Sequence, residues 1–219
     1  IAVADPTTIV KRNGVVMSGL IKNFYYEIMD STGGDYIEAD KPILMAQYTP
    51  GGNRCYMTSQ FAYGDPEMFY LSPLEQGKKD VLFYATTNSF ILFNYLNLIV
   101  STAGVGSLRL DGNAFDPVNI KPHPNHPGYS VAVARIMGSP AQHRLTCDSV
   151  FTGTMYGLGF FESYGYNIGT FINNLNNYTQ IPNTLNTNGQ IDTFTCPKTP
   201  VGLIAKLAYP ATSIHWKLS

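Results

Sequence analysis

The chain has 219 residues, enough to bury the core of one large β domain or of two small ones. Charged residues make up 13%, about half of the usual share, and the formal net charge is −1. This balance excludes a basic footprint for nucleic acid and a polybasic membrane signal, and no apolar run is long enough to span a bilayer. Aromatic residues also make up 13%, with 15 tyrosines, a composition typical of an exported β protein with a neutral, tyrosine-rich surface.

Two tight-turn dipeptides between apolar residues predict β-hairpins. Residues 8–16 contain Asn13-Gly14, and residues 107–115 contain Asp111-Gly112. Both central residues of a type I′ turn need positive φ, which these residue types tolerate. The sequence therefore predicts one hairpin near the start of the chain and a second near its middle.

Each hairpin is followed by an apolar strand, an aspartate and a second apolar strand. Residues 37–48 align without a gap on residues 145–156, which brings Asp40 onto Asp148. We therefore expect an internal duplication. We also expect the carboxylates of both aspartates to accept backbone N–H bonds and to hold equivalent turns, a structural role.

Six runs of β-branched or aromatic residues end in turn residues, and each predicts a strand. They are residues 24–28, 43–48, 81–85, 90–100, 131–136 and 151–156. The clearest helix signal is one turn, with Ser72 as N-cap and Pro73 at its first position. Such strands, separated by Gly, Pro and Asn turns, indicate a β-sandwich or jelly roll.

The composition changes after residue 172. Residues 173–190 are rich in asparagine and predict a linker or long loop. Residues 191–219, which include Trp216, resemble the opening strands of a PKD-like or immunoglobulin-like module, and such modules carry a core tryptophan on an early strand. We expect the chain to end inside this module.

The expected fold is all-β. It consists of two tandem or pseudo-symmetric sandwich-like or jelly-roll-like repeats, at about residues 7–50 and 105–158, within a domain of residues 1–172. A C-terminal immunoglobulin-like stub follows.

An acidic run before Tyr70 offers the first candidate binding residues. Asp65 and Glu67 provide hard oxygen ligands for calcium, or a carboxylate pair. The alternative is a Gly-Asp-Pro turn with acids that face solvent. We favour the turn, because a calcium loop carries several acidic or amide residues at alternating positions.

Tyr164 and Tyr166 lie in a run rich in glycine and tyrosine. Tyrosine gives a large contact area at low entropic cost, so these side chains are candidates for contact with a protein or a glycan. The same run is also typical of a bulged strand whose rings pack internally. Both interpretations stay open.

Histidine and cysteine spacing predicts neither a metal site nor a cofactor. His123 and His126 alternate with three prolines, which favours an exposed extended loop over zinc-binding geometry. Cys55, Cys147 and Cys196 match no metal spacing. We expect Cys147 to be a core residue, and one disulfide remains open. The sequence contains none of the nucleophile, phosphate-binding or dinucleotide motifs.

Residues 36–48, 64–76 and 162–169 together resemble the N-terminal domain of the IgGFc-binding protein family. Thr-Ala-Gly-Val at residues 102–105, followed by Leu-Asp-Gly, is similar to the branch found in surface proteins of Bacteroidetes-type bacteria. The resemblance covers roughly residues 7–172. It implies a non-enzymatic, secreted or surface-attached β module, often followed by PKD-like repeats, and it does not carry Fc binding to this chain.

The leading hypothesis is a cell-surface or secreted recognition or adhesion module for a protein or glycan, such as a mucin or host glycoprotein. One alternative is a carbohydrate-active enzyme or its accessory domain, which would need Asp65, Glu67 or Asp148 to converge within about 5–10 Å. A third is a structural spacer, which predicts no large concave or aromatic patch. The candidate binding residues are Asp65, Glu67, Tyr70, Tyr164 and Tyr166.

Overall fold

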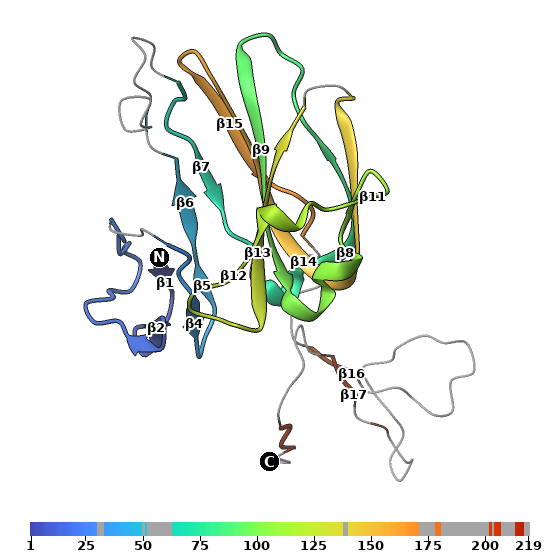
Figure 1. Cartoon of the computed structure of the whole chain (residues 1–219). Helices are drawn as coiled ribbons and strands as arrows, with labels where there is room; N and C mark the ends of the chain where they lie inside the picture. The colour runs from blue at the N-terminus through green and yellow to red at the C-terminus, as the bar shows by residue number, and fades with distance from the viewer. Residues whose placement is uncertain are drawn as a thin grey trace. The chain divides into compact units, whose positions relative to one another are not determined.

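The computed structural model describes residues 1–29, 33–49, 51, 63–137, 140–170, 178–180, 202, 204–206 and 213–216. The chain divides into two units, Ile1–Thr170 and Phe171–Ser219. The described part of the first unit consists of β-strands and three short 3₁₀ helices (Figure 1). This confirms the prediction of an all-β fold.

The elements of the first unit are short at its N-terminal end and long in its second half. The N-terminal strands are β1 (Ala2–Val3), β2 (Val10–Arg12), β3 (Val15–Val16), β4 (Ile37–Ala39), β5 (Ile43–Leu44), β6 (Ala46–Tyr48) and β7 (Met68–Tyr70). The later strands are β8 (Lys78–Tyr84), β9 (Ile91–Ser101), β10 (Arg109–Leu110), β11 (Asn113–Ala114), β12 (Ile120–Pro122), β13 (Tyr129–Ile136), β14 (Gln142–Gly159) and β15 (Glu162–Asn167). The 3₁₀ helices are η1 (Leu74–Gln76), η2 (Thr102–Ser107) and η3 (Pro117–Asn119).

One strand, β14, organises the sandwich, because its two halves belong to different layers. Its first half pairs with β8 on one edge and with β10 on the other. Its second half pairs with β9 and β15. The register on β8 shifts between Thr146 and Phe151, where the strand passes from one layer to the other. The eight-stranded sheet therefore curls into two layers, β11-β10-β14-β8 and β12-β13-β9-β14-β15.

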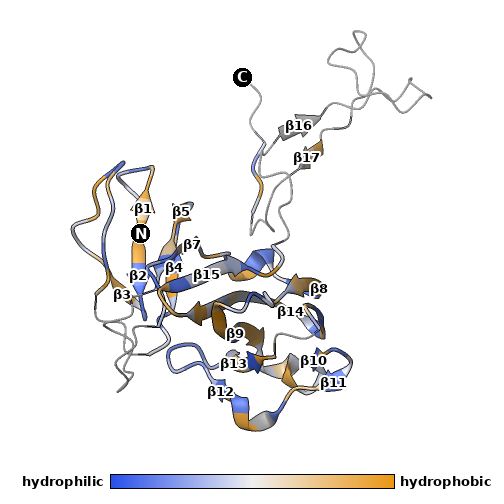
Figure 2. Ribbon diagram, turned by 90° about the horizontal axis from the view of Figure 1, so that it is seen from above, coloured by the Kyte–Doolittle hydropathy of each residue, from blue (hydrophilic) through white to orange (hydrophobic). Residues whose placement is uncertain are grey.

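The core lies between these layers. From Asn94 to Val100, every second residue of β9 is buried, including Leu96 and Leu98. Val81, Phe83 and Leu145 from the other layer belong to the same hydrophobic cluster. Figure 2 shows the hydrophobic colouring along β9. Each fully buried side chain of this size contributes about 1.5–3 kcal/mol, so the alternation fixes which face of each strand points inward.

The two predicted hairpins form, and their turns match. Asn13 and Asp111 both have φ of 53°, and Gly14 and Gly112 follow at 83° and 79°. The β2–β3 hairpin thus has the same turn as the β10–β11 hairpin. Asparagine, aspartate and glycine tolerate this left-handed conformation, which explains why the dipeptides predicted the turns.

The strand after each hairpin also pairs in the same register. The N–H of Asn13 donates to Tyr36 O, and the N–H of Asp111 donates to Arg144 O, at 2.8 Å in both cases. The carboxamide or carboxylate of the turn residue then accepts the N–H of Tyr36 or Arg144, again at 2.8 Å. We call β2, β3 and β4 the first hairpin unit, and β10, β11 and the first half of β14 the second. An origin by duplication remains a prediction.

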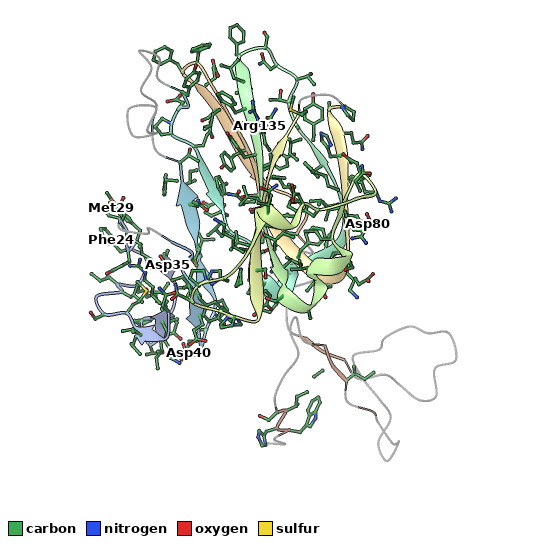
Figure 3. The ribbon with its side chains drawn as sticks, in the orientation of Figure 1. Phe24, Met29, Asp35, Asp40, Asp80 and Arg135 are labelled. Carbon is green, nitrogen blue, oxygen red and sulfur yellow. The ribbon has the colours of Figure 1, made fainter. Side chains whose placement is uncertain are left out.

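Two of the predicted elements differ in the structure. Residues 24–28 form no strand. Tyr25 makes a single bridge to Ala2, and Asn23, at φ 58°, turns the chain just before it. The aromatic side chains of this loop face solvent, and Figure 3 shows Phe24 at the outer edge of the N-terminal strands. Ser72 caps no helix, because its hydroxyl lies 2.5 Å from that of Thr170.

The remaining strand predictions hold with changed bounds. Residues 43–48 are split into β5 and β6, and residues 151–156 lie in the second half of the longer β14. Cys147 is buried with 6% exposure, as predicted. Cys55 and Cys196 lie outside the described residues.

The second unit contains an antiparallel pair, β16 (Tyr178–Gln180) and β17 (Ile204–Lys206). β16 lies inside the segment that the sequence predicts to be a linker. Trp216 is 50% exposed, which differs from the core position of the module that this segment resembles. The rest of residues 191–219 lies largely outside the described residues.

Candidate binding surface

Apolar side chains are exposed at one end of the sandwich, where β9 begins, β13 ends and β14 turns into β15. Their exposed fractions run from 38% to 70%. We call this group the apical surface, and Arg135 on β13 lies toward it in Figure 3. Its members are Phe90, Leu92, Met137, Phe160 and Phe161.

The turn between β14 and β15 places two aromatic residues where a hairpin normally uses asparagine and glycine. Gly159 pairs with Glu162, so Phe160 and Phe161 form the whole turn. Phe161 has φ of 53°, which is unfavourable for a bulky side chain. Its side chain is nevertheless 70% exposed, so burial does not offset the backbone strain. Strain of this kind clusters at functional sites.

The loop that carries Phe90 is held by its own hydrogen bonds. The N–H of Asn88 donates to Thr86 Oγ1 at 3.2 Å, and the N–H of Phe90 donates to Asn88 Oδ1 at 3.1 Å. The N–H of Ile91 then donates to Asn88 O at 3.0 Å. Asparagine side chains stabilise such turns by replacing backbone partners. The loop therefore presents Phe90 in a defined position.

A ring of hydrogen bonds anchors this loop to the sandwich. The hydroxyl of Tyr164 donates to Asn94 Oδ1 at 2.5 Å and accepts the Thr86 N–H at 3.3 Å. Asn94 Nδ2 donates to Thr86 O at 3.1 Å. Burial raises the pKa of Tyr164 to about 12, so its hydroxyl stays protonated and keeps donating. The ring of Tyr164 packs over Gly157, its cross-strand neighbour, where any side chain would collide with it.

Aromatic contacts link the apical surface to the outer face of β9. The guanidinium of Arg135 lies 4.9 Å from the centre of the Phe93 ring. Tyr63 contacts Phe93 at 5.8 Å and Phe160 at 5.0 Å between ring centres. Beside Arg135 lies a hollow of 340 Å³ lined by hydroxyl, amide and apolar side chains, including Asn88. This end of the protein thus combines exposed rings, neutral polar groups and one cation.

The structure brings part of the sequence-predicted site beside this surface. Ser163 Oγ donates to Asp65 O at 2.6 Å, which places the exposed Asp65 next to the β14–β15 turn. Glu67 is half-buried, and its N–H donates to Thr49 Oγ1 at 2.9 Å. Tyr70 is 51% exposed on β7. These three residues follow one another along the strip beside β15.

Tyr164 and Tyr166 have their hydroxyl groups directed inward. Tyr166 bonds to the backbone N–H and O of Tyr84, on the edge of β8 that faces away from β14. Both rings pack against the hydrophobic core. The two tyrosines therefore join the layers, which is the internal packing that the sequence left open.

The two predicted structural aspartates differ from each other. Asp40 lies at a bend, and its Oδ1 accepts the Ile9 N–H at 2.8 Å. Asp148 lies inside β14, exposed, and it is its N–H that donates, to Ser107 Oγ at 2.9 Å. Expecting a turn at Asp148 was wrong, because β14 continues through this position by a shift of register.

The carboxylates required by the enzyme hypothesis are far apart along the fold. Asp65 lies beside the turn at the end of β14, and Asp148 lies in the half of β14 that belongs to the other layer. Among the described residues no group of three or more His, Cys, Asp or Glu side chains is placed to hold a metal ion.

The proline-rich histidine loop is exposed at most of its positions, as predicted, but His123 within it is buried against the segment just before β4. His123 is 7% exposed, and His126 contacts the ring of Tyr36 at 4.4 Å. Asn125 Nδ2 donates to Gly34 O at 2.7 Å. Burial, with a smaller effect of His126, lowers the pKa of His123 below its ordinary value.

Sequence reasoning missed the apical surface. Its signal is the Phe160–Phe161 pair between Gly159 and Glu162, where the turn rules require small or polar residues. Two adjacent phenylalanines at such a position violate local preference, and violations of this kind are typical of functional sites.

The fold and this surface define a class, a β-sandwich with exposed aromatic side chains at one end. The family model described as IgGFc binding protein matches residues 1–157, and the chain belongs to this family. The match ends before the segment that resembles a PKD-like module, and it singles out no bacterial branch. No curated protein and no solved structure matches the chain. None of the helices among the described residues has the length and apolar character needed to cross a membrane.

Proposed function

We propose that the chain is a protein-binding module of a secreted or surface-attached protein, and that the apical surface is where the partner docks. The observation that carries this proposal is Phe161, a large ring that is 70% exposed on a backbone conformation unfavourable to it. Neither burial nor turn geometry explains this residue, whereas a partner that covers the ring would.

The geometry around Phe161 favours tight contact. The hydrogen bonds at Asn88 and Tyr164 fix the loop next to it, so little conformational entropy is lost when a partner binds. Exposed aromatic anchors of this kind contribute most of the energy of many interfaces. Arg135 and the hydroxyl-lined hollow supply polar contacts at the rim.

The ligand proposed first is a protein, and the family name makes IgG Fc the first one to test. Mucins and other host glycoproteins come next, with their glycans as a separate arm. Asp65 is proposed as a secondary contact beside the apical surface, because it lies next to the β14–β15 turn. Glu67 and Tyr70 are proposed as contacts further along β15, where Tyr70 O accepts a bond from Asn167 at the other end of the strand. The spacer hypothesis predicts no aromatic patch and therefore does not account for the apical surface.

The test measures binding of the whole chain to immobilised IgG Fc, to mucin and to a glycan array. We expect Phe161→Ser to weaken binding to the protein ligand about 30-fold, the effect of losing an interface anchor of about 2 kcal/mol. Val118→Ser is the matched control, because Val118 is 74% exposed on η3. Equal binding by both folded variants would refute the apical assignment, and absence of binding to every probe would favour the spacer hypothesis.

A further inference from the structure

The first hairpin unit lacks a neighbouring strand that the second hairpin unit has. In the second hairpin unit, Leu145 of β14 pairs with Leu110 of β10 on one edge and with Val81 of the neighbouring strand β8 on the other. The equivalent residue of the first unit, Ile37, pairs with Arg12 of β2. Among the described residues no strand pairs with the other edge of β4. β4 is therefore an edge strand, whereas the equivalent strand of the second hairpin unit, the first half of β14, is paired on both sides.

The free backbone groups of this edge can be assigned. The O of Tyr36 accepts a bond from β2, and the N–H of Asp40 donates to Ile9 O. Backbone groups alternate in an antiparallel pair, so Glu38 also faces β2, whereas Ile37 and Ala39 face away from it. In the second hairpin unit, the backbone N–H and O of Leu145 face β8.

The chain just before β4 has other contacts. Asn125 Nδ2 donates to Gly34 O at 2.7 Å, so the histidine loop packs beside residue 34. Along Ile37–Ala39, no strand among the described residues pairs with the edge that faces away from β2.

We propose that the edge of β4 binds an extended segment of a partner protein as an added antiparallel strand, in the place that β8 takes beside β14. Strand addition of this kind obtains affinity from backbone bonds and specificity from alternate side chains. The segment carries an apolar residue opposite Ile37, as Val81 lies opposite Leu145. It carries lysine or arginine opposite Glu38, which forms an ion pair with Lys11 at 3.2 Å on the β2 side and whose side chain is still 41% exposed.

A second copy of this chain does not fit the edge. Antiparallel pairing of β4 with itself about its central residue puts Glu38 opposite Glu38, and like charges in directly opposed positions destabilise a sheet. The proposal is also independent of the apical surface, which lies on other strands. Phe161→Ser should leave binding at β4 unchanged, so failure of one proposal is distinguishable from failure of the other.

The probe is a synthetic peptide with the sequence of residues 78–86 and the change Asp80→Lys, because Asp80 is the residue that would face Glu38. Hydrogen exchange of the full chain, followed by NMR, should slow at least tenfold at the amides of Ile37 and Ala39. The Glu38 amide, already bonded to β2, should not change. A control peptide with Val81→Pro lacks the N–H that faces Ile37 and should give no protection.

A charge reversal tests the side-chain requirement. The protein variant Glu38→Lys should prefer the unmodified peptide with Asp80 over the lysine peptide, reversing the preference of the original chain. Three results would overturn the proposal: unchanged exchange at Ile37 and Ala39, equal protection by the Val81→Pro peptide, or concentration-dependent dimerisation that protects these amides without peptide.

Discussion

Replacing Tyr164 by phenylalanine removes one hydroxyl group and keeps the ring over Gly157. The lost hydroxyl donates to Asn94 Oδ1 at 2.5 Å, and Asn94 is only 5% exposed. The substitution therefore leaves a buried acceptor without a donor and the Thr86 N–H without its partner. An unsatisfied buried group of this kind costs about 1–3 kcal/mol. For a unit of this size, that corresponds to a fall in Tm of about 2–12 °C.

Urea denaturation and calorimetry measure this loss, and Tyr48→Phe is the matched control because Tyr48 is 67% exposed. We expect the control to change the free energy of unfolding by less than about 0.5 kcal/mol. Hydrogen exchange at the Thr86 amide should become faster in Tyr164→Phe. Unfolding of both variants at the same urea concentration would show that the hydrogen bonds among Tyr164, Asn94 and Thr86 do not stabilise the loop.

Three further outcomes are expected. Gly157→Ala should destabilise the protein by about 1–3 kcal/mol in urea, because its Cβ would lie 2.2 Å from Tyr164 Cε1, whereas Gly106→Ala, with open space around it, should be nearly neutral. His123 has a lowered pKa in the folded state, so the unfolded chain takes up a proton on this side chain first. The free energy of unfolding should therefore fall as pH drops below about 6.5, and it should fall less in His123→Gln. Urea midpoints that shift equally in both proteins between pH 7.5 and 5.5 would contradict this. Phe161→Gly should lose ligand binding, and its free energy of unfolding in urea should stay the same or rise by up to about 1 kcal/mol, because glycine tolerates the positive φ. A clear loss of stability would show that the turn needs the aromatic ring.

The sequence predicts those parts of the fold that depend on local rules. The Asn13-Gly14 turn follows from backbone preference, and β9 follows from alternation, including its buried Leu96. The full length of β14 could not be predicted, because Asp148 interrupts the apolar pattern and only pairing with β8 and β9 keeps the strand extended. Residues 24–28 have strand composition, but composition does not reveal that, among the described residues, only Ala2 forms a bridge to them.

The site was harder to predict, since it depends on contacts between distant segments. His123 looked exposed among prolines, and its burial comes from the segment around Tyr36, far away in the sequence. Phe161 occupies a turn that local rules assign to asparagine or glycine, so those rules could not identify it. The charge of Asp65 makes it a candidate in the sequence, but its position beside the β14–β15 turn depends on a contact with Ser163, far away in the chain.

The sharing of β14 by both layers has a consequence for how the protein folds. The strand pairs with β8, β9, β10 and β15, so its pairing is complete only when segments that precede it and follow it in the chain are in place. Such non-local topology slows folding, because chain entropy is lost before the contacts that repay it can form. It also means that neither layer is complete while the other is absent. We therefore expect the deepest amides of β14 to exchange with solvent only through global unfolding, and the two layers to be gained and lost in a single cooperative step.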